Sequence, residues 1–355
     1  MQYVIDIPTE HETIIEELVR NGRVANLRTF VRIAIENQIE LESRATNAAA
    51  SDKETVKAPR AAETRSRVDG VDAKSILAIP SLRPAVFQAL QLQNPERHYL
   101  WGQYYRFLPI KLVLRVLANM TPNGPVRYAS LVGPTTQAAI AIGERLRAND
   151  DQGGRPESIG AGFPTRVEAS TERFRQQFIA DYRPDKRPRG FPVELGLETV
   201  FEQDGAVKVG LTRAGAIFAL LDNPVLDAGS REMPLAAQEQ LFLIEHVRRT
   251  LPREFEIMLS ILRVVKEDTA TPAQLDGVAR ETYGEQARTW SGGHVTTMRA
   301  GLVSRMWELG LLTREWHGRQ VRYHLTENGL ALLSGEPSKF TDAYKALYGA
   351  YEVTA

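Results

Sequence analysis

The 355-residue chain contains no cysteine. Disulfide bonds, cysteine-based zinc sites and thiol nucleophiles are therefore excluded, and a reducing, cytoplasmic location is expected. No run of apolar residues approaches the length of a membrane span, so no membrane partner is expected. The start, Met1-Gln2-Tyr3-Val4, lacks the basic and apolar regions of a signal peptide.

Signals of an enzyme are also scarce. The sequence has no loop of the pattern Gly-x-x-x-x-Gly-Lys-Ser/Thr, which argues against an intrinsic ATPase. The six histidines are scattered, without cysteines or paired acids beside them, so no metal site is predicted. We therefore expect a protein that is not an enzyme and that has no cofactor.

The net charge favours neither an acidic nor a basic partner, because 44 basic residues balance 44 acidic ones. Nucleic-acid binding depends on where the charges lie, so the local balance matters more than the total. Residues 1–43 are acidic, with four Arg against eight Asp or Glu. Residues 165–190 are basic, with seven Arg or Lys against four acids, and residues 286–325 hold six Arg against two Glu.

Residues 1–43 have the pattern of one strand and two helices. Apolar and polar side chains alternate over 2–7, which predicts a short strand. Thr9 and Glu12 form a capping box for a helix that ends at Gly22, and Asn26 caps a second helix. A unit this small cannot bury a core by itself, so it needs a partner chain.

This segment resembles the ribbon–helix–helix family of the Arc and MetJ type. The resemblance rests on Tyr3-Val4-Ile5-Asp6-Ile7-Pro8, on Gly22-Arg23 and on Asn26–Ile35. It implies a homodimer in which two chains pair their strands into a ribbon. The outward strand face carries Asp6, which disfavours DNA reading by the ribbon. The second helix can still hold a phosphate at its N-terminus, with Arg23, Asn26 and Arg28 as the candidate residues.

Residues 44–75 lose apolar periodicity and are expected to form a flexible linker. Two domains are expected beyond it, at 76–227 and 228–345. In the second domain the pattern predicts helices at 255–266, from 271 onward and at 295–309, then strands at 311–315 and 320–325.

The C-terminal segment ends in Leu325-Thr326-Glu327-Asn328-Gly329 and resembles the winged-helix family. The first domain resembles it less closely, with helices expected at 107–120, 126–131, 135–147 and 170–182. It shares the closing Leu211-Thr212-Arg213-Ala214-Gly215. The fold class expected for the chain is therefore mainly α with small β: a ribbon–helix–helix, a linker and two winged-helix-like domains.

The resemblance implies that the third C-terminal helix and the hairpin contact DNA. Arginine suits this role because its planar guanidinium group can form two parallel hydrogen bonds to phosphate or to the edge of guanine. The candidate contacts are Thr296, Thr297, Arg299, Arg305, Arg314 and Arg319. Four apolar residues of the third helix are expected in the core: Val295, Leu302, Val303 and Met306. The alternative is a protein-docking module with a solvated basic face.

The basic run at 165–190 provides a second set of candidates. Arg173 and Arg175 are placed on the recognition helix of the first domain. Lys186 and Arg187, together with Arg189, lie in a proline-rich loop that grips phosphates. An ordinary solvated loop is the competing interpretation.

The sequence thus predicts a homodimeric protein that binds double-stranded DNA, with transcriptional regulation as its role. The alternative is an adaptor subunit of a larger nucleoprotein complex that serves plasmid partition, replication or defence. In that case the winged helices hold protein partners.

Overall fold

The structure, a computed structural model, describes residues 16, 20, 67–68, 71–72, 77–80, 87–89, 92, 98–122, 124–153, 158–184, 186–230, 233–267, 270–317, 320–335 and 338–352. The chain divides into two compact units, Met1–Thr64 and Arg65–Ala355. In the first unit only Glu16 and Arg20 are described, and both are helical and exposed. The predicted ribbon, its pairing and the candidates Arg23, Asn26 and Arg28 lie outside the described residues.

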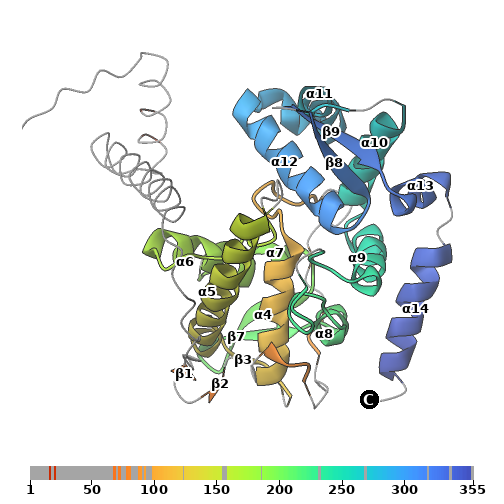
Figure 1. Cartoon of the computed structure of the whole chain (residues 1–355). Coiled ribbons are helices and arrows are strands. Elements are labelled where there is room, and N and C mark those ends of the chain that lie inside the picture. The colour runs from red at the N-terminus through yellow and green to blue at the C-terminus, as the bar shows by residue number, and fades with distance from the viewer. Residues whose placement is uncertain are drawn as a thin grey trace, which may run out of the picture. The chain divides into compact units, whose positions relative to one another are not determined.

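The second unit is mainly helical with small sheets, as predicted (Figure 1). Its α-helices are α4 (Phe107–Met120), α5 (Tyr128–Gly153), α6 (Glu168–Phe174), α7 (Phe191–Glu194), α8 (Arg213–Leu220), α9 (Ala237–Thr250), α10 (Pro252–Glu267), α11 (Pro272–Tyr283), α12 (Gly292–Glu308), α13 (Glu327–Ser334) and α14 (Ser338–Glu352). A π-helix, η2 (Arg175–Ile179), continues α6, and a 3-10 helix, η3 (Gly284–Thr289), follows α11. Three antiparallel hairpins are formed by β1 (Arg67–Val68) with β2 (Val71–Asp72), by β4 (Asp181–Arg183) with β5 (Lys186–Arg189), and by β8 (Leu312–His317) with β9 (Gln320–Leu325). A three-stranded antiparallel sheet has β7 (Ala206–Leu211) between β3 (Val126–Arg127) and β6 (Glu198–Gln203). Within the described part of the chain, none of these helices has the length and apolar character that a membrane span requires.

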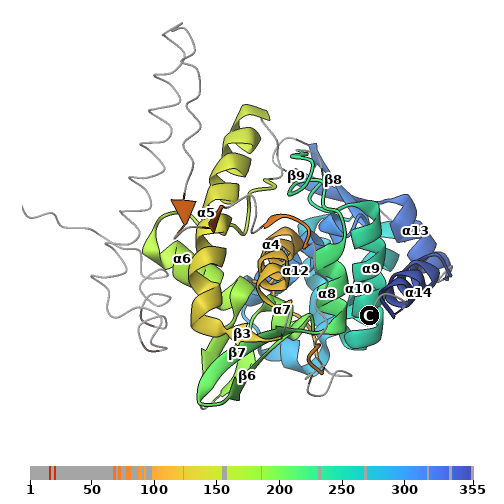
Figure 2. The ribbon, with the colours of Figure 1, turned by 90° about the horizontal axis from the view of Figure 1, so that it is seen from below.

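Helix α4 lies near the middle of the second unit, between α5 and α8 (Figure 2). Its residues 107–118 are all buried, including two cations. Lys111 Nζ lies 2.8 Å from a carboxylate oxygen of Glu239, and Arg115 donates to the carbonyls of Ala219 (2.6 Å) and Leu221 (2.9 Å). These carbonyls are at the C-terminal end of α8, where the helix dipole favours positive charge. The two buried cations therefore hold α8 and α9 against the central helix.

The same order of elements occurs twice in the second unit. Helix α4 is followed by β3 and α5 and, after the additional α6, η2, hairpin β4–β5 and α7, by the hairpin β6–β7 and α8. Helix α10 is followed by α11, α12, the hairpin β8–β9 and α13. In the first set β3 pairs with β7; in the second, Ala270 makes a single antiparallel bridge to Tyr323 of β9. In both sets the segment after the first helix lies beside the second strand of the hairpin.

The two Leu-Thr-x-x-Gly motifs have the same structure. Thr212 accepts a hydrogen bond from the Gly215 N–H at 3.1 Å, and Thr326 accepts one from the Gly329 N–H at 3.1 Å. Each hydroxyl also donates to a glycine carbonyl ahead of its hairpin, at 2.8 Å and 2.5 Å respectively. Each threonine therefore caps the helix that follows and ties it to the start of the hairpin.

The element predictions for the C-terminal part are confirmed. The helices expected at 255–266, from 271 and at 295–309 correspond to α10, α11 and α12, and the strands correspond to β8 and β9. The predicted core residues Val295, Leu302, Val303 and Met306 are all buried.

Two predictions for the rest of the chain are wrong. The helices expected at 126–131 and 135–147 are one helix, α5, which contains Pro134 and is preceded by the short strand β3. The helix expected at 170–182 turns into η2 and then into β4. Within the expected linker 44–75 the structure describes only the two short strands of the hairpin β1–β2.

The segments 76–227 and 228–345, which the sequence predicted as separate domains, lie together in the second unit. One place where they meet is the crossing of residues 98–106 over α12. A Cβ built on Gly301 would lie 2.0 Å from the carbonyl oxygen of Gly102, so the backbones approach as closely as glycine permits. This crossing fixes the position of the 98–106 segment.

His246 of α9 is a buried histidine with a defined tautomer. Its Nε2 lies 2.8 Å from the Leu195 carbonyl oxygen, which only accepts, so Nε2 carries the proton. Its Nδ1 faces the Tyr344 hydroxyl at 3.4 Å. Burial lowers the pKa of His246 to about 4, so the imidazole stays neutral in the folded protein.

We expect this histidine to make the protein sensitive to acid. The unfolded chain takes up a proton below its ordinary pKa of about 6.5, whereas the folded chain does not until about pH 4. The free energy of unfolding should therefore fall over this window, by about 3 kcal/mol from this group. Urea titrations at several pH values check this, with His246→Gln as the comparison because its amide can still donate to the Leu195 carbonyl. An equal acid dependence in parent and variant would refute it.

Candidate nucleic-acid interface

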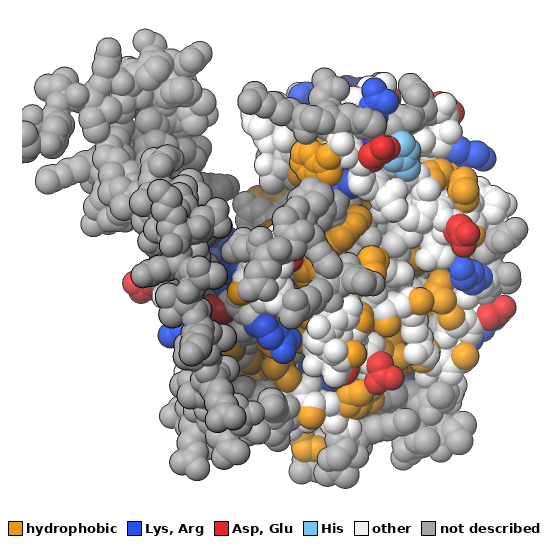
Figure 3. Space-filling view, viewed as in Figure 1, with side chains coloured by type: hydrophobic (Ala, Val, Ile, Leu, Met, Phe, Trp, Pro, Cys, Tyr) orange, Lys and Arg blue, Asp and Glu red, His pale blue; other side chains and the backbone are white. Residues whose placement is uncertain are grey.

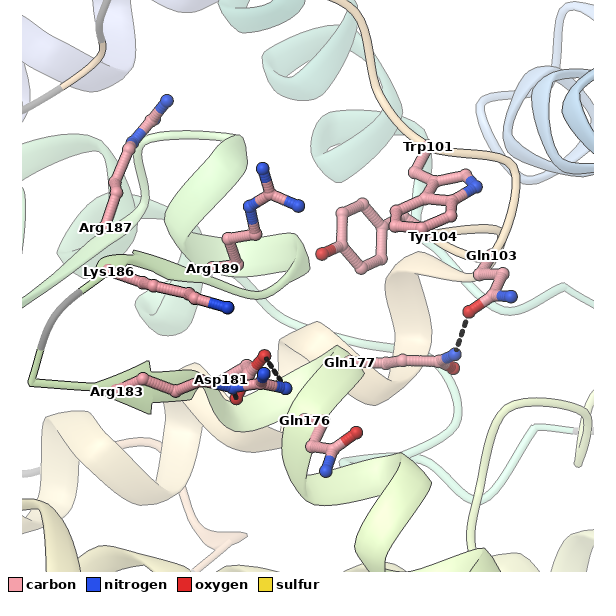
Figure 4. A pocket seen from close by; sticks show the side chains of 10 residues that line it. All are labelled: Trp101, Gln103, Tyr104, Gln176, Gln177, Asp181, Arg183, Lys186, Arg187 and Arg189. Atoms are coloured by element: carbon pink, nitrogen blue, oxygen red, sulfur yellow. Dashed lines mark hydrogen bonds and ion pairs between the residues drawn. The ribbon is translucent and has the colours of Figure 1, made fainter. Parts of the chain in front are cut away.

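A basic cavity of about 520 Å³ lies between the hairpin β4–β5, the π-helix η2 and the segment that precedes α4 (Figure 4). Its lining combines four cations with one acid, two aromatic rings and three amides. These residues are Arg183, Lys186, Arg187, Arg189, Asp181, Trp101, Tyr104, Gln103, Gln176 and Gln177. The segments that form the walls are about 80 residues apart in the sequence.

The hairpin β4–β5 is held between η2 and α7. Asp181 pairs with Arg189 and Arg183 pairs with Lys186, with an irregularity between the two pairs. Gly190 follows at a φ of 135°, and a Cβ there would lie 3.1 Å from the Ala180 Cα. Glycine is therefore required for the chain to turn from β5 into α7. This turn places the basic strand against the cavity.

The four cations of the cavity differ in how far they are paired. Arg183 bonds to Asp181 at 3.2 Å, and Arg187 lies 3.8 Å from the Glu194 carboxylate. Lys186 and Arg189 are exposed, and within the described residues neither side chain has a hydrogen bond or an ion pair. These two side chains are thus the cations of the cavity that remain available to an anion.

The aromatic side of the cavity consists of Trp101 and Tyr104, which Figure 4 shows next to each other. Tyr104 is buried and stacks on Phe191, with ring centroids 5.4 Å apart. Burial raises the pKa of Tyr104 to about 12, so its phenol is neutral. Trp101, in contrast, is 37% exposed. An exposed indole beside unpaired cations is a surface on which a planar ring can stack.

Hydrogen bonds from α12 and η2 hold the segment that carries Trp101. Arg305 of α12 donates to the carbonyls of Trp101 (3.3 Å) and Tyr104 (2.6 Å). The Gly102 N–H contacts the sulfur of Met298 at 3.1 Å, and Gln103 accepts from the Gln177 amide at 2.7 Å. The backbone under the aromatic side chains is therefore preorganised.

The structure brings two of the predicted site residues, Lys186 and Arg187, into the cavity. They lie on a paired strand and not in the loop that the prolines suggested. Arg173 is exposed on α6, outside the cavity lining. Arg175 of η2 is bound to Glu172 at 2.5 Å, so its charge is largely compensated.

Two predicted DNA contacts in α12 are wrong. Arg305 is 1% exposed and bonds to Glu254 at 2.6 Å, in the interior of the second unit. Arg299 is also buried, and its Nε lies 2.9 Å from Asp276. The Arg305 side chain is 2% exposed and the Arg299 side chain 10%, because each holds α12 against another helix.

The remaining candidates of the C-terminal part lie at the surface or outside the described residues. Thr296 and Thr297 are exposed, and their hydroxyls bond to Asp276 (3.1 Å) and to the Gly293 carbonyl (2.9 Å). Arg314 is half-buried, donates to Ser304 at 3.1 Å and lies over the Trp307 ring. Arg319 lies outside the described residues.

Helix α12 therefore offers little positive charge to a ligand. None of its exposed or half-exposed residues within the described range is a lysine or arginine. On the face of the second unit that Figure 3 shows, basic and acidic side chains are interspersed among the described residues. In the described part of the chain, the cavity beside β5 brings two unpaired cations, Lys186 and Arg189, to an open space.

Sequence reasoning missed the aromatic and amide residues of the cavity: Trp101, Gln103, Tyr104, Gln176 and Gln177. Nothing in the local pattern around Trp101 marks it, because tryptophan is most often a packing residue. The signal is its exposure next to a basic strand, which depends on tertiary structure.

Comparisons with protein-family models, curated proteins and solved structures found no match to this chain. The function is therefore inferred from the chemistry of the site.

Proposed function

We propose that this chain is a DNA-binding protein, a homodimeric transcriptional regulator, that holds phosphates on its basic hairpin β4–β5. The observation that carries this proposal is the pair of unpaired cations, Lys186 and Arg189, on the wall of an open cavity. Ammonium and guanidinium groups on a fixed strand bind phosphate oxygens, and such contacts supply most of the affinity for DNA irrespective of sequence.

The repeated order of helices and hairpins supports the same proposal. In each set a hairpin, β6–β7 or β8–β9, follows the helices. A helix whose first turn is capped by the threonine of Leu-Thr-x-x-Gly comes directly after that hairpin. This arrangement resembles the winged-helix family, in which the third helix and the hairpin meet DNA. In the C-terminal set the exposed Thr296 and Thr297, near the N-terminal end of α12, are the residues proposed to approach a groove.

The dimer is proposed from the N-terminal sequence alone. Residues 1–43 resemble a ribbon–helix–helix unit, which pairs with a second copy of itself. Two copies of the second unit on one DNA molecule would double the number of phosphate contacts. Since each contact releases counterions, the dimer binds far more tightly at low salt than one unit does.

Removal of the two unpaired cations tests the proposal. We expect Lys186→Ala with Arg189→Ala to weaken binding to all duplex sequences about equally. The slope of log affinity against log salt concentration should fall by about two units, because each lost phosphate contact removes about one. Fluorescence anisotropy with a labelled mixed-sequence duplex, titrated in salt, measures both quantities.

The matched control is Arg263→Ala with Lys266→Ala, which removes two exposed cations from α10. It should change the salt slope by much less. If both double variants lower the slope equally, the hairpin has no special role. If the parent binds neither duplex nor single-stranded DNA at low salt, the DNA-binding proposal itself is rejected.

A second candidate function is an adaptor subunit of a nucleoprotein complex. It is favoured by Trp316 of β8, which is 47% exposed and pairs across the hairpin with Val321. Exposed tryptophan is enriched at protein–protein interfaces, and α12 beside it carries no exposed cation within the described residues. Co-purification of a protein partner that Trp316→Ala releases, without intrinsic DNA affinity, would favour this function.

A further inference from the structure

We propose that the cavity lined by Trp101 and β5 binds one unstacked nucleotide of a single strand, with its base on the Trp101 indole and its phosphate on Lys186 and Arg189. This inference deepens the proposed function and rests on it, since it names the form of nucleic acid that the cavity accepts. It differs from phosphate binding alone because it requires contact with a base.

The aromatic contact is the first reason. An indole exposed at the rim of a cavity leaves a large apolar surface in water, and a base that stacks on it removes that surface. The carbonyl of Trp101 accepts from the buried Arg305, so the backbone that carries the indole is held in place before a ligand arrives. A fixed aromatic platform of this kind is how single-stranded nucleic acids are bound without sequence preference.

The amides of the cavity provide the second reason. Gln103 and Gln177 bond to each other at 2.7 Å, and Gln176 donates to Glu172 at 2.6 Å. Each amide has two donors and one acceptor oxygen with two lone pairs, so these bonds leave hydrogen-bonding capacity on all three side chains. Such groups suit the edge of a base, which presents donors and acceptors in one plane.

The size of the cavity gives the third reason. About 520 Å³ falls in the range of small-molecule sites, roughly 300–1,000 Å³. A nucleotide is of this class, whereas a section of duplex is not. The bases of a duplex also stack on each other, so none can lie on Trp101 unless it leaves the helix.

Both cations of the proposed phosphate contact line the cavity, from the two ends of β5. Figure 4 shows Arg189 pointing toward Tyr104, with Lys186 at the other end of the strand. Lysine offers a compact charge and arginine a planar fork, which together suit a phosphodiester. Arg183, bound to Asp181, adds a more distant charge of the same sign.

The test compares three labelled probes of equal length: oligothymidylate, a strand with the same backbone but abasic sites in place of bases, and a mixed-sequence duplex. Binding of the full chain to each is followed by anisotropy for the parent, Trp101→Ala and Leu330→Ala. The last variant is the control, because it removes an exposed apolar side chain of α13, away from the cavity. Trp101→Phe keeps a ring in the cavity and should restore part of the affinity.

We expect the parent to bind oligothymidylate more tightly than the abasic strand. Trp101→Ala should weaken oligothymidylate binding by about five- to 150-fold and leave the abasic strand almost unaffected, since stacking on an aromatic ring is worth about 1–3 kcal/mol per base. Leu330→Ala should change neither.

Equal affinity of the parent for the thymidylate and abasic strands would overturn the inference, as would unchanged binding in Trp101→Ala. If the duplex still binds in those cases, the proposed function stands without the nucleotide site. If no probe binds at low salt, both fall.

Discussion

Replacement of Arg305 by methionine is expected to lower the free energy of unfolding by about 3–5 kcal/mol. The guanidinium is 1% exposed and bonds to the Glu254 carboxylate at 2.6 Å. The other oxygen of Glu254 accepts from the Leu100 N–H at 3.0 Å. Removal of one partner of a buried ion pair leaves an uncompensated charge inside the protein, which is costlier than loss of the whole pair. Urea unfolding at constant pH measures the difference.

A second substitution separates this effect from simple loss of packing. The double variant Arg305→Met with Glu254→Gln removes both charges and should regain part of the lost stability. Arg263→Ala, on the exposed side of α10, should change stability by less than about 0.5 kcal/mol. If Arg305→Met unfolds at the same urea concentration as the parent, Arg305 does not hold α10 and the 98–106 segment together.

Replacement of Gly301 by alanine is expected to destabilise the protein by about 2–3 kcal/mol. The new Cβ would meet the carbonyl oxygen of Gly102 at 2.0 Å, so α12 and the 98–106 segment would have to move apart. The atoms that the new Cβ would meet belong to the backbone of Gly102, which cannot move aside as a flexible side chain does. Overpacking of this kind outweighs the gain of about 1 kcal/mol that alanine brings to a helix. Thermal or urea unfolding measures the net effect.

The control for Gly301 is Gly277→Ala in the middle of α11. Gly277 is exposed, and a Cβ there has no neighbour within 4 Å. Alanine should therefore stabilise the protein by up to about 1 kcal/mol. Opposite signs for the two glycines support a close backbone crossing at Gly301, whereas stabilisation by both substitutions would contradict it.

Local patterns predicted much of the helical part of the chain. Helix α4 begins and ends at the predicted residues, and the hairpin β8–β9 agrees within one or two residues at its ends. These elements have strong periodicity and clear end signals. The local pattern wrongly predicted a helix at Val126–Arg127. These residues form a strand that pairs with β7, because strand pairing over a long sequence distance overrides local preference. The pattern failed again at Pro134, which α5 tolerates.

The candidate site was predicted only in part, for a similar reason. Positive charge along β5 is visible in the sequence, so Lys186 and Arg187 were found. Whether an arginine is free or paired depends on distant partners. Asp276 neutralises Arg299 from another helix, and Glu254 does the same for Arg305. The position of Trp101 opposite the basic strand likewise follows from the crossing of α12, not from its own neighbours.

The central claim is that nucleic acid lies in the cavity between β5 and Trp101. Photocrosslinking of the full chain to DNA that carries iododeoxyuridine, followed by peptide mass spectrometry, tests it most directly. Single strands and duplexes are irradiated separately, and the modified peptides are identified. The account predicts adducts on Trp101 or Tyr104, lost in the double variant Lys186→Ala with Arg189→Ala. Adducts confined to the β8–β9 hairpin around Trp316, or none on the second unit, would contradict it.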